Sequence, residues 1–184
     1  MYDQCLITKT ELRKKLIEKR KNLSAEYRQS ADYKIFQSII DFEAYQKANT
    51  IFCFVSTEDE VNTHLIIKHA LNCGKSVVVP KCISKGIMNA YQIHSFEDLE
   101  SGKYGILEPK PYCKLVYPEE IDVAIIPCLS CNAEGYRIGY GGGFYDRYLR
   151  NQQFFKIAIC YEELILDEIP TDSYDEKVNI IIKG

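Results

Sequence analysis

The sequence predicts an α/β fold in three layers, with a mostly parallel central sheet, helices on both faces and two N-terminal helices. Three observations support this prediction. Five short apolar runs have the length of buried strands, the first two of them enclose a helical pattern, and two more helical patterns come before any strand. With 184 residues the chain is long enough for one hydrophobic core and short for two. We therefore expect a single domain over residues 1–184.

The two N-terminal helices are predicted from their start signals. Residues 8–11 match a capping box, in which the side chains of Thr8 and Glu11 satisfy backbone N–H groups at the helix start. Ser24 is a second candidate N-cap, before a segment to about residue 40 with apolar side chains at helical spacing. On the first helix Lys9 and Arg13 are four positions apart, so both cations project from one face.

The apolar runs that predict strands cover residues 50–55, 76–79, 122–126, 156–161 and 178–182. Their apolarity is continuous rather than alternating, which indicates strands buried on both faces of a parallel sheet. Between the first two runs, Asn62 is placed to cap a helix over 64–73 and Gly74 to end it, which gives a strand-helix-strand unit. Residues 84–114 are the least regular part, with a short antiparallel strand expected at 89–93.

Composition excludes several classes of protein. The net charge is only −3 and no run of like charges suggests a nucleic-acid or membrane-surface partner. The N-terminal segment lacks an apolar signal core, and no stretch approaches the roughly 20 apolar residues of a membrane span. We therefore expect a cytoplasmic protein that binds neither nucleic acid nor membrane, and a monomer.

The eight cysteines are scattered along the chain, which favours buried thiols in a reducing compartment over a disulfide framework. Cys128 and Cys131 have the spacing of a metal or redox motif. No second pair follows, and the three histidines are distant in sequence. The sequence thus predicts a pair of loop thiols rather than a zinc site.

A glycine-rich segment is the strongest functional signal in the chain. Four glycines in positions 139–143 free the backbone to turn its N–H groups toward an anion, and a helix from about Phe144 would add its positive end. The segment is neither a P-loop nor a dinucleotide fingerprint, and the glycines alone slightly favour a flexible strand-to-helix turn. Arg137, Asp146 and Arg147 favour a phosphate site, because ATP requires cations and a carboxylate for its metal.

Residues 137–149, Arg-Ile-Gly-Tyr-Gly-Gly-Gly-Phe-Tyr-Asp-Arg-Tyr-Leu, resemble the signature loop of the 5-formyltetrahydrofolate cyclo-ligases. Further resemblance lies at 9–13, 54–63, 105–109, 122–127, 169–170 and Asp175, in the same order along nearly the whole chain. The resemblance implies an enzyme that uses Mg²⁺ and ATP to close 5-formyltetrahydrofolate into 5,10-methenyltetrahydrofolate. It also implies a phosphorylated formyl intermediate and the release of ADP and phosphate.

The resemblance also assigns roles to individual positions. Lys9 and Arg13 match residues that contact ATP, and with Tyr145 they are the expected catalytic residues. The ATP-binding loop comprises Arg137, Ile138, Gly139, Tyr140, Gly141, Gly142, Gly143, Phe144 and Tyr145, of which Tyr140, Gly141, Gly142, Gly143 and Phe144 also face the folate. Val55 and Glu60 match positions that hold the pterin end of the substrate, and Asp146 and Asp175 match the Mg²⁺ ligands.

Without the resemblance, several of these residues have plainer interpretations. Glu60 would belong to a solvated acidic turn, Asp175 to a surface loop, and Lys9 and Arg13 to an exposed helix face. Phe144, and less so Tyr145, has the alternative role of a core anchor for the loop. The resemblance also departs at 127–135, where Cys128, Cys131 and Asn132 replace a small residue, an aromatic and an aspartate, so the substrate wall is expected to differ there.

Two other functions remain compatible with the sequence. Another ATP-dependent small-molecule kinase or ligase with the same loop would transfer phosphate without folate. A non-catalytic nucleotide- or folate-binding protein would retain the scaffold and lack turnover, although retention of Lys9, Arg13, Glu60 and Asp146 together argues against that alternative.

Overall fold

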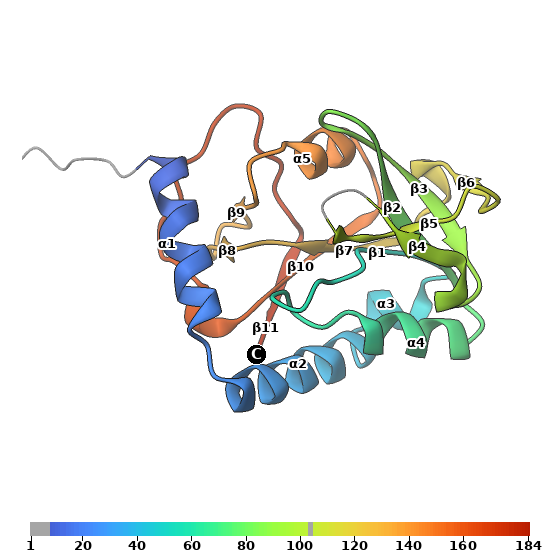
Figure 1. The fold of residues 1–184 in the computed structure, drawn as a ribbon, viewed down its shortest axis with the longest axis horizontal. Helices are drawn as coiled ribbons and strands as arrows, with labels where there is room; N and C mark the ends of the chain where they lie inside the picture. Colours follow the sequence, from blue (N-terminus) through green and yellow to red (C-terminus); the bar gives the residue numbers. More distant parts are fainter. Residues whose placement is uncertain (1–7, 103–104) are drawn as a thin grey trace, which may run out of the picture.

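A computed structural model describes residues 8–102 and 105–184 (Figure 1). Its centre is a seven-stranded sheet with the strand order β11-β10-β7-β1-β2-β3-β6. These strands are β1 (Thr50–Cys53), β2 (Ser76–Ser84), β3 (Ile87–Ile93), β6 (Leu115–Val116), β7 (Val123–Pro127), β10 (Phe155–Cys160) and β11 (Ile180–Lys183). The strands from β11 to β2 run parallel, and only β3 and β6 are antiparallel to their neighbours. The prediction of a mostly parallel sheet is confirmed.

The helices cover the sheet on both faces, which confirms the predicted three layers. They are α1 (Lys9–Lys21), α2 (Ala25–Ile40), α3 (Glu43–Lys47), α4 (His64–Asn72) and α5 (Phe144–Leu149). In Figure 1, α2, α3 and α4 lie on one face, α5 lies on the other, and α1 stands at one end of the sheet. None of the helices within the described residues has the length and apolarity needed to cross a membrane.

The predicted helix starts are confirmed by their caps. Thr8 and Glu11 form the reciprocal capping box of α1, and the side chain of Ser24 accepts a hydrogen bond at the start of α2. The start of α4 differs by one residue, because Thr63 occupies the N-cap position. The side chain of Asn62 still accepts from the backbone N–H of His64, over 3.0 Å.

The core lies between the sheet and α2 and α4. Phe52 and Ile125 from the sheet and Ile35 and Ile39 from α2 are fully buried within it. A second, smaller cluster is made by Leu12, Leu16, Leu129, Ile138 and Ile169. This smaller cluster attaches α1 to a two-stranded sheet of β8 (Ser130–Cys131) and β9 (Arg137–Ile138). It therefore fixes which side of α1 faces the rest of the protein.

The region after residue 79 is more regular than expected. β2 continues to Ser84 and pairs with β3, and β4 (Leu99–Ser101) pairs with β5 (Leu107–Pro109). The apolar run stops at Val79 because the second half of β2 is only partly buried, so its residues lack the pattern of a buried strand. Helix α3 was also not predicted, and short 3-10 turns occur at Phe96–Asp98, Pro118–Glu120 and Glu162–Leu164.

Candidate active site

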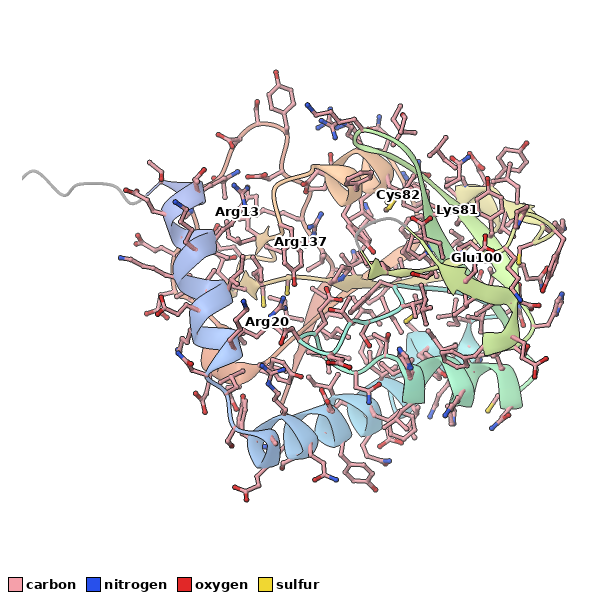
Figure 2. The ribbon with its side chains drawn as sticks, in the orientation of Figure 1. Arg13, Arg20, Lys81, Cys82, Glu100 and Arg137 are labelled. Carbon is pink, nitrogen blue, oxygen red and sulfur yellow. The ribbon has the colours of Figure 1, made fainter. Side chains whose placement is uncertain are left out.

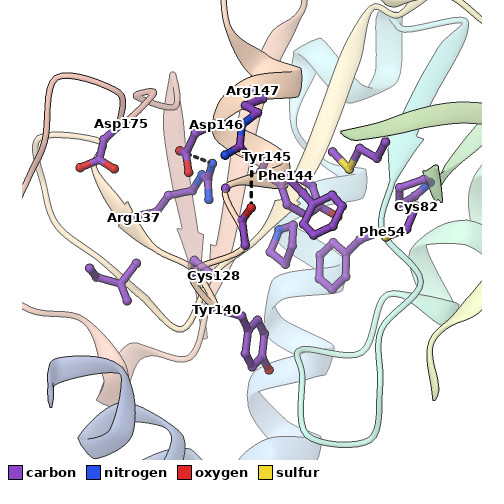
Figure 3. A pocket seen from close by; sticks show the side chains of 18 of the residues that line it. Phe54, Cys82, Cys128, Arg137, Tyr140, Phe144, Tyr145, Asp146, Arg147 and Asp175 are labelled. Atoms are coloured by element: carbon purple, nitrogen blue, oxygen red, sulfur yellow. Dashed lines mark hydrogen bonds and ion pairs between the residues drawn. The ribbon is translucent and has the colours of Figure 1, made fainter. Parts of the chain in front are cut away.

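A cavity of about 1140 Å³ opens at the carboxyl ends of β1 and β7, where parallel sheets commonly bind ligands (Figure 3). It extends from α1 to the β2–β3 hairpin. Every position assigned by the resemblance lines it: Lys9, Arg13, Val55, Glu60, Arg137, Ile138, Gly139, Tyr140, Gly141, Gly142, Gly143, Phe144, Tyr145, Asp146 and Asp175. The chain thus brings together residues from its beginning, middle and end.

The two cations of α1 reach the cavity from one face of the helix. The Nε atom of Arg13 donates to the carbonyl oxygen of Gly139 over 2.9 Å. The Nζ atom of Lys9 lies 2.5 Å from Oδ2 of Asp175 and 2.6 Å from Oδ2 of Asp172. Burial opposes the charge on Lys9, but its hydrogen bonds to Asp172 and Asp175 outweigh this effect and raise its pKa. Lys9 therefore stays charged at the edge of the cavity.

The glycine loop has a backbone that other residues rarely adopt. Gly141 and Gly143 have φ angles of 94° and 66°, in the left-handed region. A Cβ atom on Gly141 would also lie 3.2 Å from Cζ of Arg13. Arg147 closes the loop by donating to the carbonyl oxygen of Gly142 over 2.9 Å. Helix α5 begins at Phe144, directly after the loop, as predicted.

The acid Asp146 is paired with a buried cation. Nη2 of Arg137 donates to its Oδ1 over 2.8 Å, and the backbone N–H of Glu176 approaches the same oxygen at 3.4 Å. The guanidinium of Arg137 also lies 5.7 Å from the ring centroid of Tyr145. Arg137 thus orients both the carboxylate and the aromatic ring at the wall of the cavity.

The two predicted metal-binding acids have the chemistry that Mg²⁺ requires. Asp146 and Asp175 both line the cavity, and the hydrogen bonds to each carboxylate from the described residues go to one oxygen only. The other oxygen of each is therefore available to a cation. Mg²⁺ commonly binds one or two carboxylates together with phosphate oxygens and water. The residues present fit this ion.

Glu60 is fixed in place rather than solvated. Its Oε2 accepts from the backbone N–H of Thr57 over 2.9 Å and from the Thr57 hydroxyl over 3.1 Å. The hydroxyl of Tyr161 donates to the carbonyl oxygen of Glu60, at 3.2 Å, and to Asp32, at 3.1 Å. The buried Val55 follows β1 and lines the same cavity. A carboxylate held in this way accepts hydrogen bonds at a defined position.

Phe144 and Tyr145 pack against the core and line the cavity at the same time, so the two interpretations of these rings are compatible. The ring of Tyr145 meets Phe52 edge-on, with centroids 6.4 Å apart. Burial raises the pKa of Tyr145 well above its ordinary value, so its hydroxyl keeps its proton.

Several lining or neighbouring residues were not identified from the sequence. Arg20 on α1 is buried and donates to the hydroxyl of Tyr140 and to the carbonyl oxygen of Cys128. It lies two turns beyond Arg13 on the same helix face, so helical spacing could have found it (Figure 2). Asp172 and Tyr174 also line the cavity, from a segment without a periodic pattern that could have indicated them.

The prediction of two loop thiols is confirmed for Cys128, which follows β7, and wrong for Cys131. Cys128 and Cys131 are buried, and Cys131 belongs to β8. Cys160, at the end of β10, joins them, so that the three sulfur atoms lie within 4.8 Å of one another. The sequence spacing of the pair could not reveal the third cysteine, because the pairing of β7 with β10 brings it there.

Several known proteins are similar to this chain in sequence and in fold. A mouse 5-formyltetrahydrofolate cyclo-ligase is 29% identical over 95% of this chain and 92% of its own, and the cyclo-ligase of Haemophilus influenzae is 28% identical over 96% and 95%. The structure of 5,10-methenyltetrahydrofolate synthetase from Aquifex aeolicus superimposes with a TM-score of 0.86 at 29% identity, covering 96% of this chain and 90% of that chain. The synthetase of Mycoplasma pneumoniae gives 0.77 at 26% identity, covering 96% and 98%.

The family model extends this similarity to almost the whole sequence. The model of the 5-formyltetrahydrofolate cyclo-ligase family matches residues 7–184 and so includes both the N-terminal helix with its cations and the loop around Asp175. Together with the cavity formed by these segments, the match establishes that the chain belongs to the 5-formyltetrahydrofolate cyclo-ligase family.

Proposed function

We propose that the protein is a monomeric cytoplasmic ligase that converts 5-formyltetrahydrofolate and ATP into 5,10-methenyltetrahydrofolate, ADP and phosphate, with Mg²⁺. One observation carries the proposal: the N-terminal cations and the glycine loop meet at the cavity that also contains Glu60. Arg13 contacts Gly139 directly, and Glu60 lies on the same cavity. A triphosphate requires cations and backbone N–H groups, and a pterin beside it requires an acceptor for its N–H groups.

The chemical problem is that the formamide oxygen of the substrate is a poor leaving group. In the first proposed step this oxygen attacks the γ-phosphorus of ATP. A new O–P bond forms, and the bond from the γ-phosphorus to the β,γ-bridging oxygen breaks as ADP leaves. N10 of the folate then attacks the activated formyl carbon. Phosphate departs with the former formyl oxygen, N10 loses its proton, and the five-membered ring is closed.

The protein contributes position and charge to both steps. Lys9, Arg13 and the N–H groups of residues 139–143 stabilise the negative charge that develops on the transferred phosphate. Tyr145 remains a neutral hydroxyl at the same wall and is available as a hydrogen-bond donor that adds no charge. No protein nucleophile is required, because the substrate oxygen attacks phosphorus itself. Catalysis then depends on how closely the two substrates are held together.

Asp146 and Asp175 would hold Mg²⁺, which supplies Lewis-acid stabilisation of the phosphate oxygens when bound. Arg137 keeps Asp146 directed into the cavity through its 2.8 Å ion pair, and Lys9 does the same for Asp175 at 2.5 Å. Val55 and Glu60 would orient the pterin, with the carboxylate accepting from the N–H groups of the ring. These contacts set the formyl group against the triphosphate.

The activity is tested by following the methenyl absorbance on mixing protein, 5-formyltetrahydrofolate, Mg²⁺ and ATP, with each omitted in turn. The proposal expects product formation only in the complete mixture, with ADP released in equal amount. Phosphoryl transfer in the absence of folate would instead identify a different kinase or ligase. Tight binding of either substrate without turnover would identify a binding protein.

A further inference from the structure

A cluster of three buried thiols reaches the wall of the cavity through Cys128, and the proposed reaction uses none of them. The residues Cys128, Cys131 and Cys160 retain 7%, 0% and 1% of their accessible surface. Their sulfur atoms all lie within 4.8 Å of one another. Three sulfurs bound to one Zn²⁺ ion at about 2.3 Å stand about 4 Å apart, so only small movements are needed to bind an ion.

The three cysteines are held by the sheet rather than by a flexible loop. Cys128 directly follows β7, Cys131 ends β8, and Cys160 ends β10. Strands β7 and β10 are paired, with Pro127 opposite Ile159, so Cys128 and Cys160 are the next residues of the two strands. While it is protonated, Cys128 donates to the carbonyl oxygen of Ile159 over 3.3 Å. The backbone therefore sets the sulfur positions in advance.

The surroundings favour negative charge on the sulfur of Cys128. Arg20 donates to the backbone of Cys128, and both Arg20 and Arg137 act electrostatically on its thiol, as Lys183 does on Cys131. Hydrogen bonds from Cys131 and Cys160, aided by the two arginines, hold the pKa of Cys128 well below its ordinary value. The same hydrogen bonds raise the pKa of the other two thiols.

The structure assigns to Cys128, Cys131 and Cys160 a binding site for one thiophilic metal ion, with Zn²⁺ as its representative. A disulfide would use only two of the three sulfurs and leave the third thiol buried. Cys128 lines the cavity, which gives the ion a path of entry and leaves its fourth position to water. Binding of the ion displaces the thiol protons that the three cysteines still carry. The resulting centre of one Zn²⁺ and three thiolates carries one net negative charge. Arg20 offsets this charge, since Arg137 is already paired with Asp146.

The test is titration of the reduced full-length protein with Zn²⁺ against a chromophoric chelator, followed by Cd²⁺ binding observed through thiolate-to-metal charge-transfer absorbance. The expected result is one ion per chain, a Zn²⁺-dependent rise in Tm, and affinity reduced more than about 100-fold in Cys131→Ala and in Cys160→Ala. Cys53→Ala is the matched control, because it removes an equally buried thiol from β1 and should keep wild-type affinity.

The variant Cys73→Ser distinguishes metal binding at the buried cluster from metal binding at the surface. The exposed Cys73 has its sulfur 3.7 Å from Nε2 of His69, so these two residues are the surface alternative. Loss of metal binding in that variant alone would overturn the proposal. The proposal would also be contradicted if the reduced wild-type protein bound no Zn²⁺ but lost two hydrogens by mass on mild oxidation. That result would identify a redox pair instead of a metal site. If an alanine variant fails to fold, the Zn²⁺-induced Tm shift of the wild type, compared with that of Cys131→Ser, decides the question.

Discussion

The Nε atom of Arg13 donates a hydrogen bond to the carbonyl oxygen of Gly139 and so joins the first helix to the glycine loop 126 positions further along the chain. The guanidinium is thereby held beside the loop that is proposed to bind the triphosphate. A Cβ atom at position 141 would lie 3.2 Å from Cζ of the same arginine. This close approach also explains why a glycine occupies the position. The contact links the two halves of the proposed ATP site.

Replacing Arg13 by alanine should lower kcat/KM for ATP by about 10- to 150-fold. A hydrogen bond to a charged group contributes about 1.5–3 kcal/mol, and each 1.36 kcal/mol corresponds to about a tenfold change in rate. Steady-state kinetics with varied ATP measures the effect. Lys15→Ala is the matched control, since Lys15 is an exposed cation of the same helix that does not line the cavity. Unchanged turnover in Arg13→Ala would contradict the proposed role.

Alanine at Gly141 should impair both stability and ATP affinity, whereas alanine at Gly74 should impair stability alone. Both glycines have left-handed φ angles, of 94° and 73°, where an alanine costs about 1–2 kcal/mol. Only at Gly141 would the new methyl group press on Arg13, because nothing lies within 4 Å of a Cβ on Gly74. Chemical denaturation gives the stabilities and ATP titration gives the affinities. If the two variants had equal ATP affinity, the close approach of Arg13 to position 141 would not contribute to ATP binding.

Glu60→Gln should raise KM for 5-formyltetrahydrofolate by about 10-fold or more and leave KM for ATP unchanged. Glutamine keeps the size of the side chain and removes its charge, and hydrogen bonds to a charged partner contribute about 1.5–3 kcal/mol. Glu58→Gln removes an exposed charge from the same turn without touching the cavity, and serves as the control. A rise in KM for ATP of the same size would place Glu60 with the nucleotide instead.

Tyr145 should make the protein less stable at alkaline pH. Burial raises its pKa in the folded state, so above about pH 10 the unfolded chain loses this proton while the folded chain keeps it. The folded state then binds more protons, and the free energy of unfolding falls as pH rises. Tyr145→Phe should therefore lose less stability between about pH 9 and pH 11 than the wild type. Denaturation at both pH values measures the difference.

A second tyrosine separates the catalytic contribution of the Tyr145 hydroxyl from its effect on stability. Burial also raises the pKa of Tyr148, whose ring stacks on Phe52 but does not line the active-site cavity. Tyr148→Phe should show the same alkaline effect on stability and keep wild-type kcat, whereas Tyr145→Phe should lower kcat. If both variants keep wild-type kcat, Tyr145 acts only through its packing.

The sequence predicted the parts of the site that depend on local pattern. Helical spacing placed Lys9 and Arg13 on one face, and the glycines with their flanking charges indicated a phosphate loop. Their meeting in one cavity depends on the small apolar cluster that orients α1, which brings together Leu12, Leu129 and other residues far apart in the sequence. Local periodicity says that an apolar face must be buried, but not against which segment.

The features that the sequence missed follow from long-range pairing. Cys160 joins Cys128 because β10 lies next to β7, and strand order is not encoded in the pattern of any single strand. Asp172 reaches Lys9 from a segment without regular structure, where no spacing rule applies. Arg20 is different, because its position two turns from Arg13 was visible in the sequence. Its burial was unexpected, since an arginine at a helix surface is usually solvated.

Asp175 has two candidate roles, which are binding Mg²⁺ and holding Lys9 in place. Because Lys9 pairs with Asp172 as well, the two roles can be distinguished. Asp172→Asn and Asp175→Asn each remove one charged partner of Lys9, at 2.6 Å and 2.5 Å. If Asp175 binds Mg²⁺, only its variant should raise the Mg²⁺ concentration needed for half-maximal activity, by about 10-fold, because one carboxylate ligand is lost. Activity measured against Mg²⁺ at saturating ATP gives this value. An equal rise in both variants would mean that the two acids act through Lys9, and Asp175 would then have no separate role as a ligand.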